Sequence, residues 1–223
     1  MKMQGVIVLG KGELAIRVAG WFLQSPDYKL QAVVPVLPEP SWAPSFQTWA
    51  RTKNLPIVET GHYKDIDGVS HEDWNVDLAV SIFYDKIIKE WFIRKCRRIL
   101  NLHNSPLPKY RGVSPINWAL ENNELEHGVT IHEIIPGIDD GPVVAQLKYS
   151  IYPDFDEVID VYNRAIEYGW TLFQQTMPLI GKIQARQQLE SQATYYSSAQ
   201  NHLLGERRSF RRQDSLASKN PGR

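Results

Sequence analysis

Short apolar runs alternate with amphipathic segments through the first half of the chain. The run at residues 5–10 is rich in branched side chains and bounded by glycines, as is typical of a parallel strand buried on both faces. Three similar runs follow, at residues 30–37, 76–84 and 99–103. Apolar residues at helical spacing occupy the intervals, near residues 13–24, 45–54 and 87–97. This alternation predicts an α/β fold with a doubly wound, mostly parallel sheet.

The pattern changes in the second half of the chain. Residues 126–135 alternate with the period of a strand, and residues 141–151 resemble an antiparallel partner for them. We expect one helix to start at Pro115 and a longer one near residues 156–176, where apolar residues form a single stripe. The second half therefore predicts a hairpin of strands between two helices.

Size and charge favour an ordinary globular protein. The 223 residues fit one large domain, expected over residues 1–186, with a short C-terminal extension over residues 187–223. Lys plus Arg equal Asp plus Glu at 25 each, so the total charge gives no indication of nucleic-acid or membrane binding. A basic tail at residues 206–223 has six Lys or Arg against two acids, a net charge of +4. No apolar run is long enough for a membrane span or a signal peptide, so we expect a cytoplasmic protein.

The chain has one cysteine, Cys96, which excludes an internal disulfide bond and a cysteine zinc site. Basic neighbours could lower the pKa of this thiol and make it reactive. A position on a helix would instead make it a space-filling residue, and we favour this second interpretation.

The loop after the first predicted strand resembles a dinucleotide-binding turn only in part. Gly10 and Gly12 lead into a helix, and Ala15 stands where the third glycine of that fingerprint falls, which is a permitted variant. The acidic residue expected about 20 residues later is missing, because none follows until Glu39. What remains is either a tight strand-to-helix turn or an anion site formed by helix amides and Lys11.

Two polar residues stand at the end of the apolar run at 99–103. Asn101 and His103 are two apart, so they point to the same side of a strand, near the sheet edge where α/β proteins bind ligands. An amide beside an imidazole can stabilise a developing oxyanion, and the imidazole can move a proton. A structural strand end is the alternative. We expect no metal, because His103 lacks a second ligand at helical spacing and His127 and His132 are not spaced like a zinc pair.

An acid that could orient the imidazole lies in the stretch PGIDDGP. Asp139 and Asp140 stand in a turn between the two predicted antiparallel strands. Taken alone, such a stretch is more often a plain hairpin connection, so these residues by themselves leave the function open. Ser105 is a poor candidate for a nucleophile, because the glycines of a nucleophile elbow are missing around it.

Together these stretches resemble the folate-dependent formyltransferase family. NLHNSPLPKYRG at residues 101–112 and GVTIHEIIPGIDDGPVV at residues 128–144 match its motif of Asn-x-His, Ser, Leu-Pro and Arg-Gly, then a Gly-Val-Thr strand and an Asp-x-Gly turn. The likeness covers about residues 1–180. One departure is Pro106, where relatives often have Leu, so the loop after His103 could have a different shape.

The resemblance implies the chemistry and the residues that perform it. The family's catalytic Asn, His and Asp fall on Asn101, His103 and Asp139. A substrate amine would attack the formyl carbon of 10-formyltetrahydrofolate, and Asn101 and His103 would stabilise the resulting oxyanion. Asp139 would keep the imidazole protonated and help to move the proton. The positions that match the family's folate site are Tyr84, Asp85, Lys86, Ile87 and Gly137.

The acceptor is suggested by comparison within the family. A methionyl-tRNA formyltransferase would need a larger C-terminal domain than the chain after Gly181 provides. Glycinamide ribonucleotide transformylase fits better in length, but its first loop usually has small polar residues where this chain has Lys11 and Glu13. The first loop and the stretch QATYYS are more similar to nucleotide-sugar N-formyltransferases. The resemblance therefore implies a nucleotide-linked amino sugar as acceptor, for example a dTDP-4-amino-4,6-dideoxyhexose used in polysaccharide biosynthesis.

Three residues are candidate contacts to the sugar or its pyrophosphate: Lys11, Tyr110 and Arg111. We also expect a homodimer, in which QATYYS could pair as strands between subunits. The alternatives are glycinamide ribonucleotide transformylase, a folate- or nucleotide-binding protein without turnover, and an RNA-binding protein that uses its basic tail. The complete Asn-His-Asp set argues against the non-catalytic protein, and the zero net charge argues against RNA binding.

Overall fold

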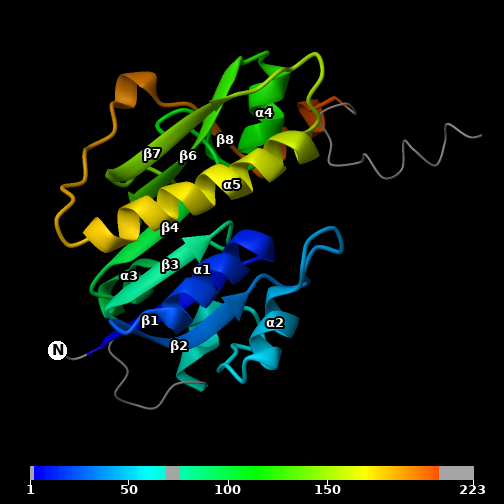
Figure 1. Ribbon diagram of the computed structural model, residues 1–223. Coiled ribbons are helices and arrows are strands. Elements are labelled where there is room, and N and C mark those ends of the chain that lie inside the picture. Colours follow the sequence, from blue (N-terminus) through cyan, green and yellow to red (C-terminus); the bar gives the residue numbers. More distant parts are fainter. Residues whose placement is uncertain (1–2, 69–75, 206–223) are drawn as a thin grey trace, which may run out of the picture.

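The computed structural model of the chain describes residues 3–68 and 76–205 (Figure 1). In this part of the chain one sheet has six strands in the order β2-β1-β3-β4-β6-β7. These strands are β1 (Gln4–Gly10), β2 (Tyr28–Pro35), β3 (Leu78–Ile82), β4 (Ile99–His103), β6 (Glu126–Glu133) and β7 (Val143–Ser150). The first four pair in parallel, whereas β6 is antiparallel to both β4 and β7. The predicted α/β fold with a mostly parallel sheet is confirmed.

Helices cover both faces of this sheet. The α-helices are α1 (Gly12–Gln24), α2 (Phe46–Thr52), α3 (Glu90–Lys95), α4 (Pro115–Glu121) and α5 (Val158–Thr176). Short 3-10 helices are η1 (Tyr63–Gly68), η2 (Met177–Leu179), η3 (Glu190–Gln192) and η4 (Ser198–Leu203). Helices α1 and α5 lie side by side on one face, where they pack against each other and against the sheet (Figure 1).

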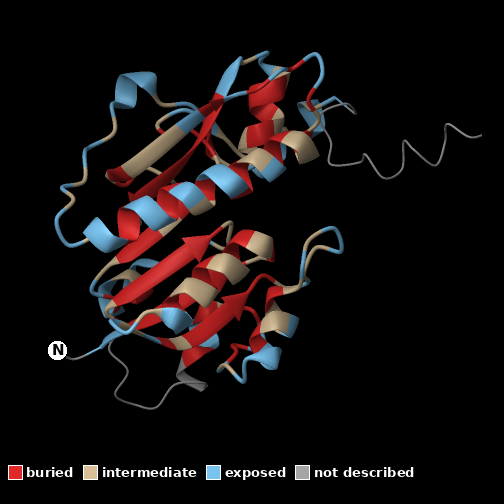
Figure 2. Cartoon of the chain, viewed as in Figure 1, coloured by how far each residue is buried: buried red, intermediate tan, exposed pale blue. Residues whose placement is uncertain are grey.

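The central strands read as continuous apolar runs because both of their faces are buried (Figure 2). In β1, Val6 and Val8 belong to the core beneath α1 and α5. Their neighbours Ile7 and Leu9 belong to a second core, formed with η1 and α3 on the opposite face. A strand with only one buried face would alternate apolar and polar residues, as β7 does toward its end.

The C-terminal segment returns to the body of the molecule. Strand β8 (Tyr195–Tyr196) pairs in parallel with β5 (Arg111–Gly112), in a small sheet of two strands. The stretch QATYYS therefore pairs within its own chain, where we had expected pairing between subunits. The predicted basic tail at residues 206–223 lies outside the described residues. None of the helices in residues 3–68 and 76–205 is both long and apolar enough to cross a membrane.

Candidate active site

Strand β4 brings Asn101 and His103 to its carboxyl end, on one side of the sheet. The ring of His103 is buried, and Asn101 is half-buried. Antiparallel pairing with β6 places His132 opposite Asn101 and Thr130 opposite His103. Directly opposed residues of paired strands share a face, so β4 and β6 together present four polar side chains on that face.

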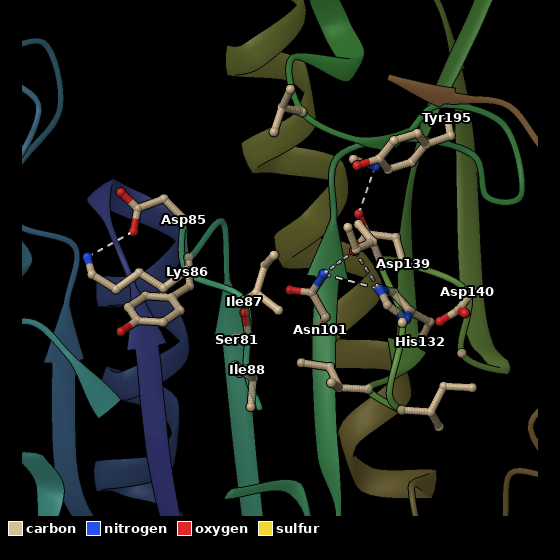
Figure 3. A pocket seen from close by; sticks show the side chains of 18 of the residues that line it. Ser81, Asp85, Lys86, Ile87, Ile88, Asn101, His132, Asp139, Asp140 and Tyr195 are labelled. Carbon is tan, nitrogen blue, oxygen red and sulfur yellow. Dashed lines mark hydrogen bonds and ion pairs between the residues drawn. The ribbon is translucent and has the colours of Figure 1, made fainter. Parts of the chain in front are cut away.

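Asp139 joins this group from the connection between β6 and β7. Its backbone is left-handed, with φ +52°, a conformation that Asp tolerates better than most residues. One carboxylate oxygen, Oδ1, accepts a hydrogen bond from Nδ2 of Asn101 at 3.3 Å and lies 3.5 Å from Nε2 of His132 (Figure 3). The other, Oδ2, accepts from the backbone N–H of Gly112 at 2.9 Å and lies 3.5 Å from Nδ1 of His103. The structure thus brings together the three residues predicted to be catalytic.

Hydrogen-bond partners determine which ring nitrogens bear a proton. Nε2 of His103 is 2.9 Å from the carbonyl oxygen of Tyr110, and Nδ1 of His132 is 2.9 Å from that of Glu133. A carbonyl oxygen can only accept, so both of these nitrogens carry a hydrogen. In neutral His132 the other nitrogen, Nε2, then accepts from Nδ2 of Asn101 at 3.1 Å. This contact fixes which side of the Asn101 amide bears the NH₂ group.

The pKa of Asp139 lies well below its ordinary value. Burial, the largest single influence, would raise this pKa because it disfavours the charged form. The positive charge of His103 acts in the opposite direction, as do the hydrogen bond from the amide of Gly112 and, when its ring is protonated, His132; together they outweigh burial. The carboxyl group is therefore ionised at neutral pH, although its side chain is only 15 % exposed.

His132 is a site residue that the sequence did not indicate. Its ring is buried between Asn101 and Asp139 and orients the Asn101 amide. The only signal in the sequence is its place on the same face of its strand as Thr130, two residues earlier. That signal identifies the site only once the register of β6 against β4 is known.

A cavity of about 330 Å³ opens beside Asn101 and Asp139 (Figure 3). The loop after β3, the stretch between His132 and Gly141, and Tyr195 of β8 form its walls. All five residues predicted to bind folate line it: Tyr84, Asp85, Lys86, Ile87 and Gly137. Five isoleucines contribute apolar surface, namely Ile87, Ile88, Ile134, Ile135 and Ile138. A mostly apolar wall with a few polar groups suits a ligand with a large flat ring system.

The polar side chains in the loop after β3 are occupied by their neighbours. The hydroxyl of Tyr84 donates to the carbonyl of Gly61 at 2.9 Å and accepts from the N–H of Tyr63 at 3.2 Å. Lys86 pairs with Asp85 at 3.2 Å (Figure 3). The carbonyl oxygen of Ile87 is occupied as well, by the hydroxyl of Tyr63 at 3.1 Å. The loop therefore presents to the cavity the rest of its backbone and the apolar side chains of Ile87 and Ile88.

A second cavity, of about 400 Å³, adjoins the first. The two share six lining residues: Tyr84, Asp85, Asn101, Gly112, Val113 and Asp139. Trp42, Phe83 and Tyr162 form an aromatic wall of the second cavity and do not line the first. Their ring centroids are 5.1 Å apart for Trp42–Tyr162 and 5.8 Å for Phe83–Tyr162. The two cavities therefore meet at Asn101 and Asp139.

Lys11, a predicted substrate contact, lines the second cavity and is the only Lys or Arg among its described lining residues. It precedes the first residue of α1, where backbone N–H groups attract anions. Burial lowers the pKa of its ammonium group, and Asp85 partly offsets this effect. An anionic ligand in this cavity would meet both the helix end and the lysine.

Tyr110 and Arg111, the other two predicted substrate contacts, line neither cavity, so their assignment is corrected. The Tyr110 ring is buried and stacked on Tyr196 at 5.7 Å, and its hydroxyl donates to Glu124 at 2.8 Å. The Arg111 guanidinium donates to Gln188 at 2.8 Å and to Glu190 at 2.6 Å. The physical reason is the pairing of β5 with β8, which turns both side chains toward the C-terminal segment.

Two other kinds of site receive no support from the described part of the chain. No group of three or more His, Cys, Asp or Glu in residues 3–68 and 76–205 is arranged to hold a metal ion. Cys96 is buried at the end of α3, and burial raises the pKa of its thiol to about 12. A thiol with so high a pKa is protonated at neutral pH, so Cys96 is a space-filling residue.

Comparison with known proteins identifies relatives with this fold. Residues 62–177 match the family described as formyl transferase, which is just over half of the chain. The sugar 3-N-formyltransferase WlaRD, solved with dTDP and 5-N-formyl-tetrahydrofolate, is 27% identical, with a TM-score of 0.73 over 89% of this chain and 71% of that chain. An N-formyltransferase from Helicobacter canadensis, solved with folinic acid and dTDP-3-aminofucose, is 25% identical, with a TM-score of 0.73 over 89% and 72%.

A third relative carries a different nucleotide sugar. PseJ from Anoxybacillus kamchatkensis, in complex with UDP-4,6-dideoxy-4-formamido-L-AltNAc and tetrahydrofolate, is 26% identical, with a TM-score of 0.63 over 89% of this chain and 88% of that chain. The family match and the fold shared with these relatives identify an enzyme that transfers a one-carbon group. The chain belongs to the formyl transferase family and is a folate-dependent formyltransferase.

Proposed function

We propose that this enzyme transfers a formyl group from 10-formyltetrahydrofolate to the amine of a nucleotide-linked amino sugar. The observation that carries this proposal is the meeting of two cavities at one polar group. Asn101 and Asp139 line both, one with an apolar wall and the other with an aromatic wall and Lys11. A group transfer between two large substrates requires such an arrangement, because both reacting atoms must reach the same catalytic residues.

The first cavity is the proposed site of the formyl donor. Its isoleucines suit the face of a pterin ring, and the backbone at residues 84–86 and 137 would bond the ring edge. Three solved relatives at 25–27% identity have folate derivatives bound. When bound there, the donor supplies a formyl carbon next to Asn101 and Asp139.

The chemistry is addition of the amine to the formyl carbon, followed by loss of the folate nitrogen. A new C–N bond forms to the acceptor, the bond between the formyl carbon and the folate nitrogen breaks, and one proton moves from the amine to that nitrogen. Nδ2 of Asn101 stabilises the oxyanion, since its hydrogen bond to Asp139, at 3.3 Å, is long enough to be exchanged for a stronger one. Nδ1 of His103, 3.5 Å from Asp139, is the ring nitrogen that exchanges the proton.

Asp139 acts on both partners in this mechanism. Its ionised carboxylate stabilises positive charge as it develops on the His103 ring or on the attacking amine. The Gly112 amide holds Oδ2, and His132 holds the Asn101 amide, so neither group has to reorganise during the reaction. Pre-arranged groups of this kind act most strongly in a site with little water, and the His103 ring is only 8 % exposed.

The second cavity is the proposed acceptor site. Lys11 and the N-terminus of α1 provide positive charge for a pyrophosphate, and Trp42, Phe83 and Tyr162 offer rings for stacking on a base or a deoxysugar. WlaRD was solved with dTDP, and the enzyme from Helicobacter canadensis with dTDP-3-aminofucose. These features support an acceptor that combines an amino sugar with a nucleoside diphosphate.

An acceptor screen tests the proposal. Release of tetrahydrofolate from 10-formyltetrahydrofolate is followed with a dTDP-linked 4-amino-4,6-dideoxyhexose, the free amino sugar and glycinamide ribonucleotide at equal concentration. The nucleotide-linked sugar should be strongly preferred, because binding of the remote nucleotide helps to position the amine. A preference for glycinamide ribonucleotide would overturn the sugar assignment and leave the formyl transfer standing. Absence of turnover with nucleotide-linked amines that vary in sugar and base would instead indicate a binding protein.

A further inference from the structure

The chain after α5 returns to the catalytic loop and contacts it at several points. Arg186 exchanges two backbone hydrogen bonds with Val143, at 2.7 and 2.8 Å. Further along, β8 pairs with β5, so that the backbone of Tyr196 lies against Gly112. A Cβ atom on Gly112 would lie 2.1 Å from the Tyr196 carbonyl oxygen, which shows how close this approach is. Gly112 is also the residue whose N–H binds the carboxylate of Asp139.

Gln188 lies between these two contacts and uses both ends of its side-chain amide. Its Nε2 donates to the carbonyl oxygen of Asp139 at 2.8 Å and to that of Gly141 at 2.7 Å. Its Oε1 accepts two hydrogen bonds from the guanidinium of Arg111, at 3.0 and 2.8 Å. Arg111 is itself 7 % exposed and is also bound by Glu190. One side chain thus connects the turn that bears Asp139 to strand β5.

These contacts hold Asp139 by its backbone and by its carboxylate. Gln188 binds the backbone carbonyl, while the N–H of Gly112, adjacent to Arg111, binds the carboxylate. The backbone of Asp139 is left-handed, so the turn depends on its surroundings to maintain this conformation. Asp139 lies 3.5 Å from His103, where a small displacement changes the geometry of proton transfer.

We propose that Gln188 is a positioning residue for formyl transfer: by joining the carbonyl oxygens of Asp139 and Gly141 to Arg111, it fixes the Asp139 carboxylate against His103. The inference rests on the proposed function, because it assumes that Asp139 acts in the reaction. It makes the segment at 186–196 a part of the active site, although Gln188 lines neither cavity among the described residues.

The substitution Gln188→Glu separates positioning from mere stability. The new carboxylate keeps the size of the side chain and an acceptor for Arg111, but it replaces the NH₂ group with an oxygen that faces two carbonyl oxygens. Gln188→Met is the second variant, because it retains the length and removes every hydrogen bond. Gln187→Ala is the matched control, since Gln187 is the exposed neighbour in the chain. Steady-state kinetics with 10-formyltetrahydrofolate and the best acceptor from the screen give kcat and KM.

Both Gln188 variants should lose kcat by about tenfold or more, with the KM of the acceptor changed by less than about threefold. Gln187→Ala should match the wild type, and all folded variants should melt cooperatively. A kcat of Gln188→Met within about threefold of the wild-type value would overturn the inference. This includes the case in which only Gln188→Glu loses kcat, because the loss would then come from repulsion between the new carboxylate and the two carbonyl oxygens. If formyl transfer itself fails, the wild type gives no turnover with any acceptor; if only the sugar assignment fails, the wild type still turns over another acceptor and the Gln188 variants are compared with that one, so the failures are distinct.

Discussion

The proposed catalytic chemistry depends on the environment of single atoms. Asn101 contributes one N–H to the nascent oxyanion while its other N–H stays on His132, and His103 contributes Nδ1 while its Nε2–H stays on the Tyr110 carbonyl. Each group is therefore held at one end and available at the other. Such a group can act on a substrate without losing its orientation, which is the source of its catalytic effect.

Removal of either group should therefore abolish most of the rate. We expect Asn101→Ala to lower kcat by about 10²–10³, the usual effect of losing one preorganised oxyanion donor. His103→Ala removes the group that moves the proton and should lower kcat by about 10²–10⁴. The circular dichroism spectrum and the binding of tetrahydrofolate should be retained, which separates loss of chemistry from loss of fold. Turnover within about threefold of the wild type would remove that residue from the catalytic group.

The charge of Asp139 can be separated from its size. Asp139→Asn keeps the shape but cannot stabilise a cationic ring, so turnover should collapse, whereas Asp140→Asn should be mild. Because the pKa of Asp139 is lower in the folded chain, its ionisation stabilises the fold above the unfolded pKa of about 3.9, and this contribution is lost as the pH falls further. Urea unfolding should show the difference between wild type and Asp139→Asn shrinking below about pH 4. A greater loss of turnover in Asp140→Asn than in Asp139→Asn would show that Asp140, and not Asp139, has this role.

Some of these residues could be predicted from the sequence and others could not. Asn101 and His103 are two apart on one strand, so their common direction follows from strand geometry alone. Asp139 was indicated only through the family motif, because a pair of aspartates in a turn is common. His132 depends on the register of β6, and Gln188 reaches the site from 49 residues beyond Asp139. Neither contact leaves a periodic signal in the sequence.

At the scale of elements, alternation of apolar and polar segments identified the sheet and its helices. The predicted strand at 99–103 coincides with β4, and the helix expected to start at Pro115 is α4. Predicted ends were less accurate: the helix expected at 87–97 is α3, Glu90–Lys95. The pairing of β5 with β8 was missed because each strand has only two residues, too few for a pattern. In the sequence Tyr110 and Arg111 simply follow the catalytic loop, which is why they are candidate substrate contacts until this pairing is known.

The pairing of β5 with β8 is stabilised by stacked rings, which gives a stability prediction. The ring centroid of Tyr196 is 4.4 Å from that of Trp118 and 5.7 Å from that of Tyr110, and both pairs are stacked. Tyr196→Ala should lower the free energy of unfolding by about 1–3 kcal/mol, since each aromatic pair contributes about 0.5–1.5 kcal/mol. Tyr195→Ala is the matched control; its side chain is half exposed, and the change should stay within about 0.5 kcal/mol. Equal effects in urea unfolding would contradict the stacking account.

At the scale of the whole molecule, charge should act on acceptor binding more than on chemistry. Lys11 lines the second cavity at the start of α1, so Lys11→Ala should raise the KM of a nucleotide-linked acceptor about tenfold with little change in kcat. Added salt should weaken wild-type binding more than that of the variant. Because burial lowers the pKa of Lys11, the wild-type KM should also rise at a lower pH than an ordinary lysine would require. Lys29→Ala, at an exposed position on β2, should leave the KM unchanged.

The central claim is that the two cavities hold the two substrates and that Asn101 and Asp139 lie between the reacting atoms. The most direct measurement is a crystal structure with 5-formyltetrahydrofolate and the preferred nucleotide-linked amino sugar bound together. We expect the pterin in the cavity lined by residues 84–88 and the diphosphate near Lys11. The amine should lie about 3–3.5 Å from the position of the transferable formyl carbon, beside Asn101 and Asp139. Ligands in exchanged cavities, or an amine remote from Asn101 and Asp139, would contradict the account.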